Sequence, residues 1–179
     1  MKIKEGKMPY AVTHILVPLI LIGLFRDYVS KRRFPLYYVF IGGIAGILPD
    51  LDVIVFYILS FFGFALNEVH RTFSHTLFFP LLFLLLGLLT IKNRGRRKLN
   101  LSIIFLVISF GIFTHLVLDG ILSGKIIPFY PISYYSIGLN LISLAPFSWQ
   151  PLILPSLDAA LLILWLCYLE VKHKISDFV

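Results

Sequence analysis

The chain has 179 residues, of which 59% are hydrophobic and 14% are charged, and its formal net charge is +7. A soluble domain is normally about 45–50% apolar and about 25% charged, so this composition excludes a soluble fold. The length allows one domain, and we expect a single integral membrane domain over residues 1–179. The basic excess is typical of cytoplasmic loops beside anionic lipid headgroups and does not indicate nucleic-acid binding.

A helix needs about 20 apolar residues to cross a bilayer, within a range of about 17–25. Six apolar runs follow one another along the chain: 9–25, 35–48, 53–66, 76–91, 99–118 and 152–171. The third run is short for a span because about 14 residues rise only about 21 Å. The sequence therefore predicts an all-α polytopic transmembrane bundle of about five spans, plus a short interfacial or re-entrant helix over 53–66.

The stretch before the last apolar run has a clear pattern. Residues 123–150 hold several prolines among many Ser and Tyr residues, which predicts a long ordered loop. The loop contains aromatic residues typical of a membrane interface, namely Tyr130, Tyr134, Tyr135 and Trp149.

No small-residue cleavage site follows the first run, so we expect no cleavable signal peptide. The single Cys167 excludes an internal disulfide, and its apolar neighbours predict a small core residue.

The basic residues predict the topology. Eleven of the 16 Lys and Arg residues lie at run ends that can share one side of the membrane: Arg26, Lys31, Arg32, Arg33, Lys92, Arg94, Arg96, Arg97, Lys98, Lys172 and Lys174. The positive-inside rule assigns that side to the cytoplasm. The other side keeps Lys2, Lys4, Lys7, Arg71 and Lys125. We therefore predict a multi-pass cell membrane protein whose N-terminus lies outside the cytoplasm.

Seven of the fourteen His, Asp and Glu residues fall at run ends predicted to lie at one depth, near the non-cytoplasmic face: His14, Asp50, Asp52, His70, His75, His115 and Asp119. Ionisable groups at that depth are costly unless they are paired or bind a metal. His115 and Asp119 are four residues apart and can share one helix face. Asp50 and Asp52 follow Pro49 in a turn and would point the same way if extended, where a carboxylate could bridge two ions. This convergence indicates a functional site.

We predict that these seven residues surround one or two divalent transition ions. A single catalytic zinc takes about three protein ligands, so seven candidates suggest two or more ions, with some residues acting as a base or supporting the ligands. Zn²⁺ is the expected ion, and mixed imidazole and carboxylate ligation also suits Mn or Fe. The expected catalytic residues are Asp52, His70 and Arg71, of which Arg71 would contact a phosphate group.

Several of these residues taken alone also have a purely structural interpretation. His14 alone is more often a hydrogen-bonded buried histidine, and His115 with Asp119 can form an interhelical pair. Asp52 can cap a helix that starts at Val53. Arg71 can form a salt bridge with a neighbouring carboxylate, either Asp50 or Asp52.

Three further ionisable residues are expected to lie outside the site. Asp158 follows Pro155-Ser156-Leu157, a pattern typical of a helix start, so we expect it to cap the last helix rather than to bind a metal. Glu68 is expected to be solvated. His173 lies among the cytoplasmic cations and is expected to play no part in the site.

Four motifs occur in order along the chain: Thr13-His14, Leu48-Pro49-Asp50-Leu51-Asp52, His70-Arg71-Thr72-Phe73-Ser74-His75 and Thr114-His115-Leu116-Val117-Leu118-Asp119. Together they resemble the YdjM-type family of membrane-bound metal-dependent hydrolases, over nearly the whole chain. The order of the His and Asp residues is also similar, more distantly, to the helical zinc-dependent phospholipase C and single-strand nuclease superfamily. The resemblance implies one hydrolase-like domain that uses a metal-activated water.

We therefore expect hydrolysis of a phosphoester in a lipid or lipid-like substrate, at the outer membrane surface. The expected partners are membrane lipid and a small amphiphilic substrate, with no nucleic acid. A carboxylic ester or amide is an alternative substrate, because a metal-activated water also attacks carbonyl groups. An ion- or proton-coupled transporter would cluster ionisable groups in the same way, and a non-enzymatic interaction protein is a third alternative. The sequence lacks the HExxH motif of zinc proteases and the SGH motif of membrane lipid phosphatases.

Overall fold

The computed structural model describes residues 11–30, 34–63, 73–93 and 100–174. Its main helices are α1 (Ala11–Leu24), α2 (Leu36–Ala45), α3 (Asp52–Ser60), α5 (Phe78–Leu89), α6 (Leu101–Leu118) and α7 (Gln150–His173). Single π-helical turns extend α1 over Phe25–Val29 and α6 over Asp119–Ser123, and short 3₁₀ turns cover Leu48–Leu51, Phe73–His75, Ile91–Asn93 and Leu141–Leu144. Within these ranges the one β contact is an isolated bridge between Ile126 and Ile137. The predicted all-α class is confirmed.

Three helical segments are long and apolar enough to cross a membrane: Ala11–Val29, Leu101–Leu122 and Gln150–His173. The segments Leu36–Ala45 and Leu48–Ser60 pass the same test only as a pair, and the two are bent by 50°. Helix α5 is apolar but has 12 residues, which is short for a span. The described part of the chain therefore holds three candidate spans, or four if the bent pair is one span. The predicted count of about five is not confirmed.

The bend between α2 and α3 follows from Pro49. Proline has no N–H and its ring clashes with the carbonyl four residues earlier, which here is that of Ala45. Helix α2 ends at Ala45, and the chain continues as the 3₁₀ turn Leu48–Leu51 before α3 begins at Asp52. The short helix expected after the Pro-Asp motif is therefore present as α3, at an angle to α2. The bend places Asp50 in the 3₁₀ turn and Asp52 at the first residue of α3.

Helices α1, α2 and α6 enclose the apolar core, which consists of Leu16, Leu19, Ile22, Tyr38, Val39, Val107 and Trp165. Small residues let the backbones approach closely, as is common between membrane helices. A Cβ added at Gly111 of α6 would lie 2.3 Å from the carbonyl oxygen of Gly42 in α2. Two hydroxyl groups of α6, Ser102 Oγ and Ser109 Oγ, donate to α5 carbonyls over 2.8 Å. A close backbone contact therefore joins α6 to α2, and hydroxyl hydrogen bonds join α6 to α5.

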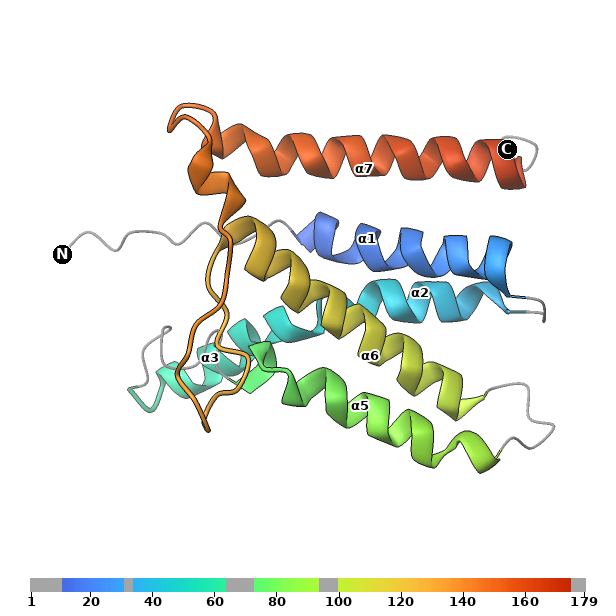
Figure 1. Cartoon of the computed structure of the whole chain (residues 1–179), viewed down its shortest axis with the longest axis horizontal. Helices are drawn as coiled ribbons and strands as arrows, with labels where there is room; N and C mark the ends of the chain where they lie inside the picture. Colours follow the sequence, from blue (N-terminus) through green and yellow to red (C-terminus); the bar gives the residue numbers. More distant parts are fainter. Residues whose placement is uncertain (1–10, 31–33, 64–72, 94–99, 175–179) are drawn as a thin grey trace.

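Helix α7 lies along α1 at the edge of the bundle (Figure 1). Only 11% of the most apolar 18-residue segment of α7 is buried. Trp165 makes the central contact, because a Cβ added at Gly23 of α1 would lie 3.1 Å from its ring. Cys167 is exposed, so the prediction that it is a core residue is wrong. The narrow buried face of α7 leaves most of its apolar side chains on the outside, where lipid would surround them.

The loop between α6 and α7 crosses the end of the bundle, and its orange trace reaches the start of α5 (Figure 1). Backbone hydrogen bonds order it, as the sequence predicted. Leu77 N donates to Pro128 O over 2.9 Å, and Leu139 N donates to Gly120 O over 2.7 Å. Ile126 and Ile137 exchange two further hydrogen bonds of 2.8 and 2.9 Å. The exposed aromatic residues of this loop include Tyr134, Tyr135 and Trp149.

Candidate metal centre

Five of the seven predicted ligands meet inside the bundle. His14 comes from α1, Asp50 from the turn between α2 and α3, His75 from the turn before α5, and His115 and Asp119 from the end of α6. The three histidines and Asp119 are at most 2% exposed. The Asp50 side chain is 21% exposed, so the cluster reaches the molecular surface on the Asp50 side.

The candidate ligand atoms are spaced as they would be around one ion. His75 Nε2 and His115 Nε2 are 3.2 Å apart, and each is 3.5 Å from Asp50 Oδ1. Asp119 Oδ2 is 3.6 Å from His75 Nε2 and 3.8 Å from His115 Nε2, and Asp119 Oδ1 is 3.5 Å from His14 Nε2. Atoms about 2.1 Å from a tetrahedral ion would be about 3.4 Å from one another. The nitrogen-to-oxygen spacings are longer than good hydrogen bonds, which favours a shared cation over direct pairing.

His14 supports this interpretation independently. Its side chain is 1% exposed, and neither ring nitrogen has a hydrogen-bond partner within the described residues. Its ring packs against that of His115, with centroids 4.0 Å apart. A buried polar group without a hydrogen bond costs about 1–3 kcal/mol. The alternative of a hydrogen-bonded buried histidine is therefore not supported, whereas an ion would use one of these nitrogens.

The ligand atoms form two overlapping groups, His14–Asp50–His115 and His75–His115–Asp119, each with its atoms within 4.8 Å of one another. His115 belongs to both. Its Nδ1 lies 2.7 Å from the carbonyl oxygen of Gly46, so Nδ1 carries the proton and Nε2 keeps its lone pair. Because one imidazole nitrogen binds a single ion, only one of the two groups can use His115 at a time, so the five residues form one cluster of three imidazoles and two carboxylates.

Asp52 lies behind His75 rather than in either ligand group. Ser74 Oγ donates to Asp52 Oδ2 over 2.8 Å, and His75 Nδ1 is 3.1 Å from Ser74 Oγ and 3.3 Å from Asp52 Oδ2. These contacts leave His75 Nε2 facing His115, an arrangement typical of a carboxylate that orients a metal-binding histidine. Asp52 does not cap α3, whose N-cap is Leu51 with no side-chain hydrogen bond.

Gly46 is a site residue that the sequence analysis missed. A Cβ at this position would lie 1.9 Å from the carbonyl oxygen of His14 and 2.9 Å from Pro18 Cγ. Pro18 follows His14 by four residues and has no N–H, so the His14 carbonyl lacks its usual helical donor and faces Gly46 instead. The Gly46 carbonyl in turn accepts the hydrogen bond from His115. The sequence signal for this contact was Pro18, which lies one helical turn after the candidate ligand His14.

The remaining predicted residues fall elsewhere. His70, Arg71 and Glu68 lie outside the described residues, so their roles stay predictions. Asp158 lies well inside α7, which begins at Gln150, so its predicted role as a helix cap is wrong. Its carboxylate instead accepts a hydrogen bond from Thr13 of α1.

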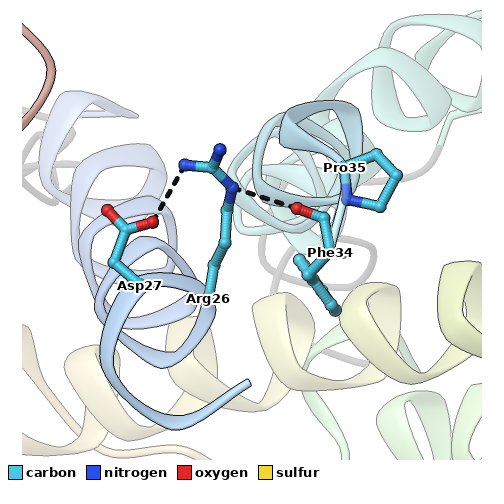
Figure 2. Close-up of a pocket in the computed structure, with 4 residues that line it drawn as sticks. All are labelled: Arg26, Asp27, Phe34 and Pro35. Carbon is cyan, nitrogen blue, oxygen red and sulfur yellow. Dashed lines mark hydrogen bonds and ion pairs between the residues drawn. The ribbon is translucent and has the colours of Figure 1, made fainter. Parts of the chain in front are cut away.

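A second polar cluster lies at the opposite end of α1, where it joins α1 to α7. Arg26 Nη1 donates to Asp27 Oδ1 over 3.0 Å. The other oxygen of Asp27 accepts from the Tyr168 hydroxyl and lies 2.8 Å from His173 Nε2, so His173 is away from the candidate centre, as predicted. An open surface pocket of about 410 Å³ lies at this end, and Figure 2 shows the residues that line it: Arg26, Asp27, Phe34 and Pro35. This cluster ties two helices and contains no group of metal ligands within the described residues.

The comparisons with known proteins give one match. A family model described as YdjM inner membrane protein matches residues 8–175. No curated protein and no solved structure matches the chain. The matched range covers almost the whole chain and includes all five ligands of the candidate centre.

Proposed function

Because the chain belongs to the YdjM inner membrane protein family, we propose that this membrane protein is a metal-dependent hydrolase with its site at the His and Asp cluster. One observation carries the proposal. Three imidazoles and two carboxylates from separate segments converge with spacings that suit one ion, within a bundle of apolar helices. Burying so many ionisable groups in a membrane protein is costly unless they serve a function.

The proposed cofactor is one divalent transition ion. Nitrogen ligands would come from among His14, His75 and His115 and oxygen ligands from Asp50 and Asp119, with one coordination position left for water. This mixture suits Zn²⁺ and is also compatible with Mn or Fe. The sequence left room for a second ion; we propose one, because the two ligand groups share His115.

The residues of the chain can be given roles in phosphoester hydrolysis. When bound, the ion supplies an activated water at neutral pH and polarises the bond under attack. The water oxygen bonds to phosphorus, the ester P–O bond breaks, and the leaving alcohol oxygen takes a proton. Asp50 is the carboxylate of the centre that reaches the surface. It presents Oδ1 to His75 and His115, which leaves its other oxygen to accept the water proton and release it. Asp52 is assigned the positioning of His75, through Nδ1.

The proposed substrate is a lipid phosphoester at the membrane surface. The loop tied to the site end exposes Tyr134, Tyr135 and Trp149, residues that favour the depth of lipid headgroups. Arg71, in the same motif as His75, has a guanidinium suited to a phosphate. The motif order shared with phospholipase C-like proteins supports this substrate class by analogy only.

An assay of the metal-loaded protein against phospholipids, isoprenoid phosphates and acyl esters in detergent tests the function. We expect turnover of a phosphoester. Arg71→Ala should lower turnover about 100-fold, because it removes charge stabilisation at the phosphate, while metal content stays unchanged. Lys125→Ala is the matched control, since Lys125 is an exposed cation in the loop at the site end.

The other outcomes separate the alternatives. Turnover confined to acyl esters would contradict the phosphoester assignment and leave the metal centre intact. No turnover, together with ion-dependent flux in liposomes, would favour the transporter. An unchanged Arg71→Ala enzyme would contradict the role of Arg71 alone.

We also propose that the centre lies near the non-cytoplasmic face. The ends of α1, α5 and α7 that lead to basic residues lie together at one end of the bundle (Figure 1), opposite the ligand-bearing ends. With Cys167→Ser as background, Ser133→Cys should react with an impermeant maleimide from outside intact cells. Gly95→Cys should react only after permeabilisation, because it lies in a basic cytoplasmic loop. Labelling of both from the same side would contradict this topology.

A further inference from the structure

Helix α7 supplies no ligand to the centre. It does carry a carboxylate, Asp158, that contacts Thr13, the residue before the candidate ligand His14. Asp158 accepts a hydrogen bond from Thr13 Oγ1, and Thr13 is 2% exposed. A carboxylate within a membrane helix is costly, and Asp158 does not cap α7. Asp158 also belongs to neither ligand group. Its contact with α1 is the role that the structure gives it.

The backbone beside His14 lacks one regular helical hydrogen bond. Pro18 has no N–H, so it deprives the His14 carbonyl of its helical donor. The regular hydrogen bonds therefore hold His14 less firmly than a residue in the middle of a helix. Two outside contacts act on this part of the backbone instead: Gly46 lies against the His14 carbonyl, and Asp158 binds Thr13.

We infer that Asp158 is a positioning residue of the candidate metal centre. Its hydrogen bond from Thr13 fixes the α1 backbone next to His14 and so holds the His14 ring against His115. Asp158 touches neither the ion nor the substrate. The inference rests on the metal centre proposed above and adds α7 to the elements that determine its geometry.

The opposite end of the same helix pair provides a matched control. There the Tyr168 hydroxyl of α7 donates to Asp27 at the end of α1. Tyr168→Phe removes one hydrogen bond between α1 and α7, as Asp158→Ala does, but far along the helix from His14. A difference between the two variants therefore separates positioning of His14 from simple helix packing.

The test measures metal affinity in the purified full chain, by competition with a chelator, together with the visible absorption of bound Co²⁺. Asp158→Ala and Thr13→Val should each weaken affinity about tenfold or more, the range seen when a residue that orients a ligand is lost, and should change the Co²⁺ spectrum. Asp158→Asn keeps an acceptor and Thr13→Ser keeps a donor, so both should restore affinity. Tyr168→Phe should leave affinity and spectrum unchanged.

Two results would overturn the inference. One is wild-type affinity and spectrum in both Asp158→Ala and Thr13→Val. The other is an equal loss of affinity in Tyr168→Phe, which would show that the hydrogen bond only packs α7. If Asp158→Ala does not fold, the nearly isosteric Thr13→Val decides. A wild-type chain that binds the ion but hydrolyses nothing would contradict the proposed function and leave this inference standing, whereas a chain that binds no ion would overturn both.

Discussion

Replacing both His115 and Asp119 by alanine is expected to lower metal affinity at least about 100-fold and to leave the purified protein without bound ion. The double variant removes two of the five ligands of the candidate centre. His115 is the residue that both ligand groups share, so neither group remains complete without it. Metal analysis of the purified protein, combined with chelator competition, measures the loss.

The control for this variant is His173→Ala. His173 also pairs with a buried carboxylate, that of Asp27, so its loss removes a histidine–aspartate contact of the same kind. The contact lies at the other end of the bundle, and metal content should stay at the wild-type level. Full metal occupancy in the double variant would show that the ion binds elsewhere.

Gly46→Ala is expected to disrupt the centre without changing any ligand. The added methyl carbon would lie 1.9 Å from the His14 carbonyl oxygen, and because this is a backbone atom, α1 or α2 has to move. Overpacking of this kind costs about 1–3 kcal/mol, and here it also displaces the carbonyl that orients His115. We expect a lower thermal unfolding midpoint in detergent and a metal affinity reduced at least about tenfold.

Gly120→Ala is the comparison for this second variant. Gly120 directly follows Asp119, but a Cβ there would meet its nearest neighbour, Ile126 Cδ1, at 3.7 Å, an ordinary van der Waals distance. Stability and metal affinity should therefore stay close to those of the wild type. Wild-type affinity in Gly46→Ala would mean that the close crossing of α1 and α2 does not control the centre.

The meeting of the candidate ligands could be predicted from the sequence, because the lengths of the apolar runs and the basic residues at their ends give each run end a predicted depth in the membrane. Apolar runs of known length, with basic residues at alternate ends, place His14, His75 and His115 at one level without any knowledge of packing. The spacing of His115 and Asp119 places both on one helix face, and the structure brings them to one centre.

The role of Asp52 could not be predicted, because it depends on local backbone geometry. In an extended segment, residues two apart point the same way, and this would have placed Asp50 and Asp52 together. Pro49 instead produces a 3₁₀ turn, in which neighbours two apart diverge. Asp50 therefore contacts Nε2 of His75, whereas Asp52 contacts Nδ1 of the same ring.

Other features depended on tertiary contacts. Pro155 suggested a helix start, but α7 begins five residues earlier and accommodates this proline, as membrane helices can. The exposure of Cys167 depends on which face of α7 meets α1, and an almost uniformly apolar helix does not reveal that face. Gly46 has no side chain to attract notice, and only the crossing of α1 and α2 reveals its role.

The loop after α6 has a consequence for motion during turnover. Its two anchoring hydrogen bonds involve Leu77, two residues after His75, and Gly120, the residue after Asp119. The loop cannot lift without breaking these backbone hydrogen bonds beside two candidate ligands. We therefore expect a rigid rim rather than a lid, with substrate arriving past Asp50 while the loop stays in place. A centre built in this way would exchange substrate and product without rearranging its own coordination.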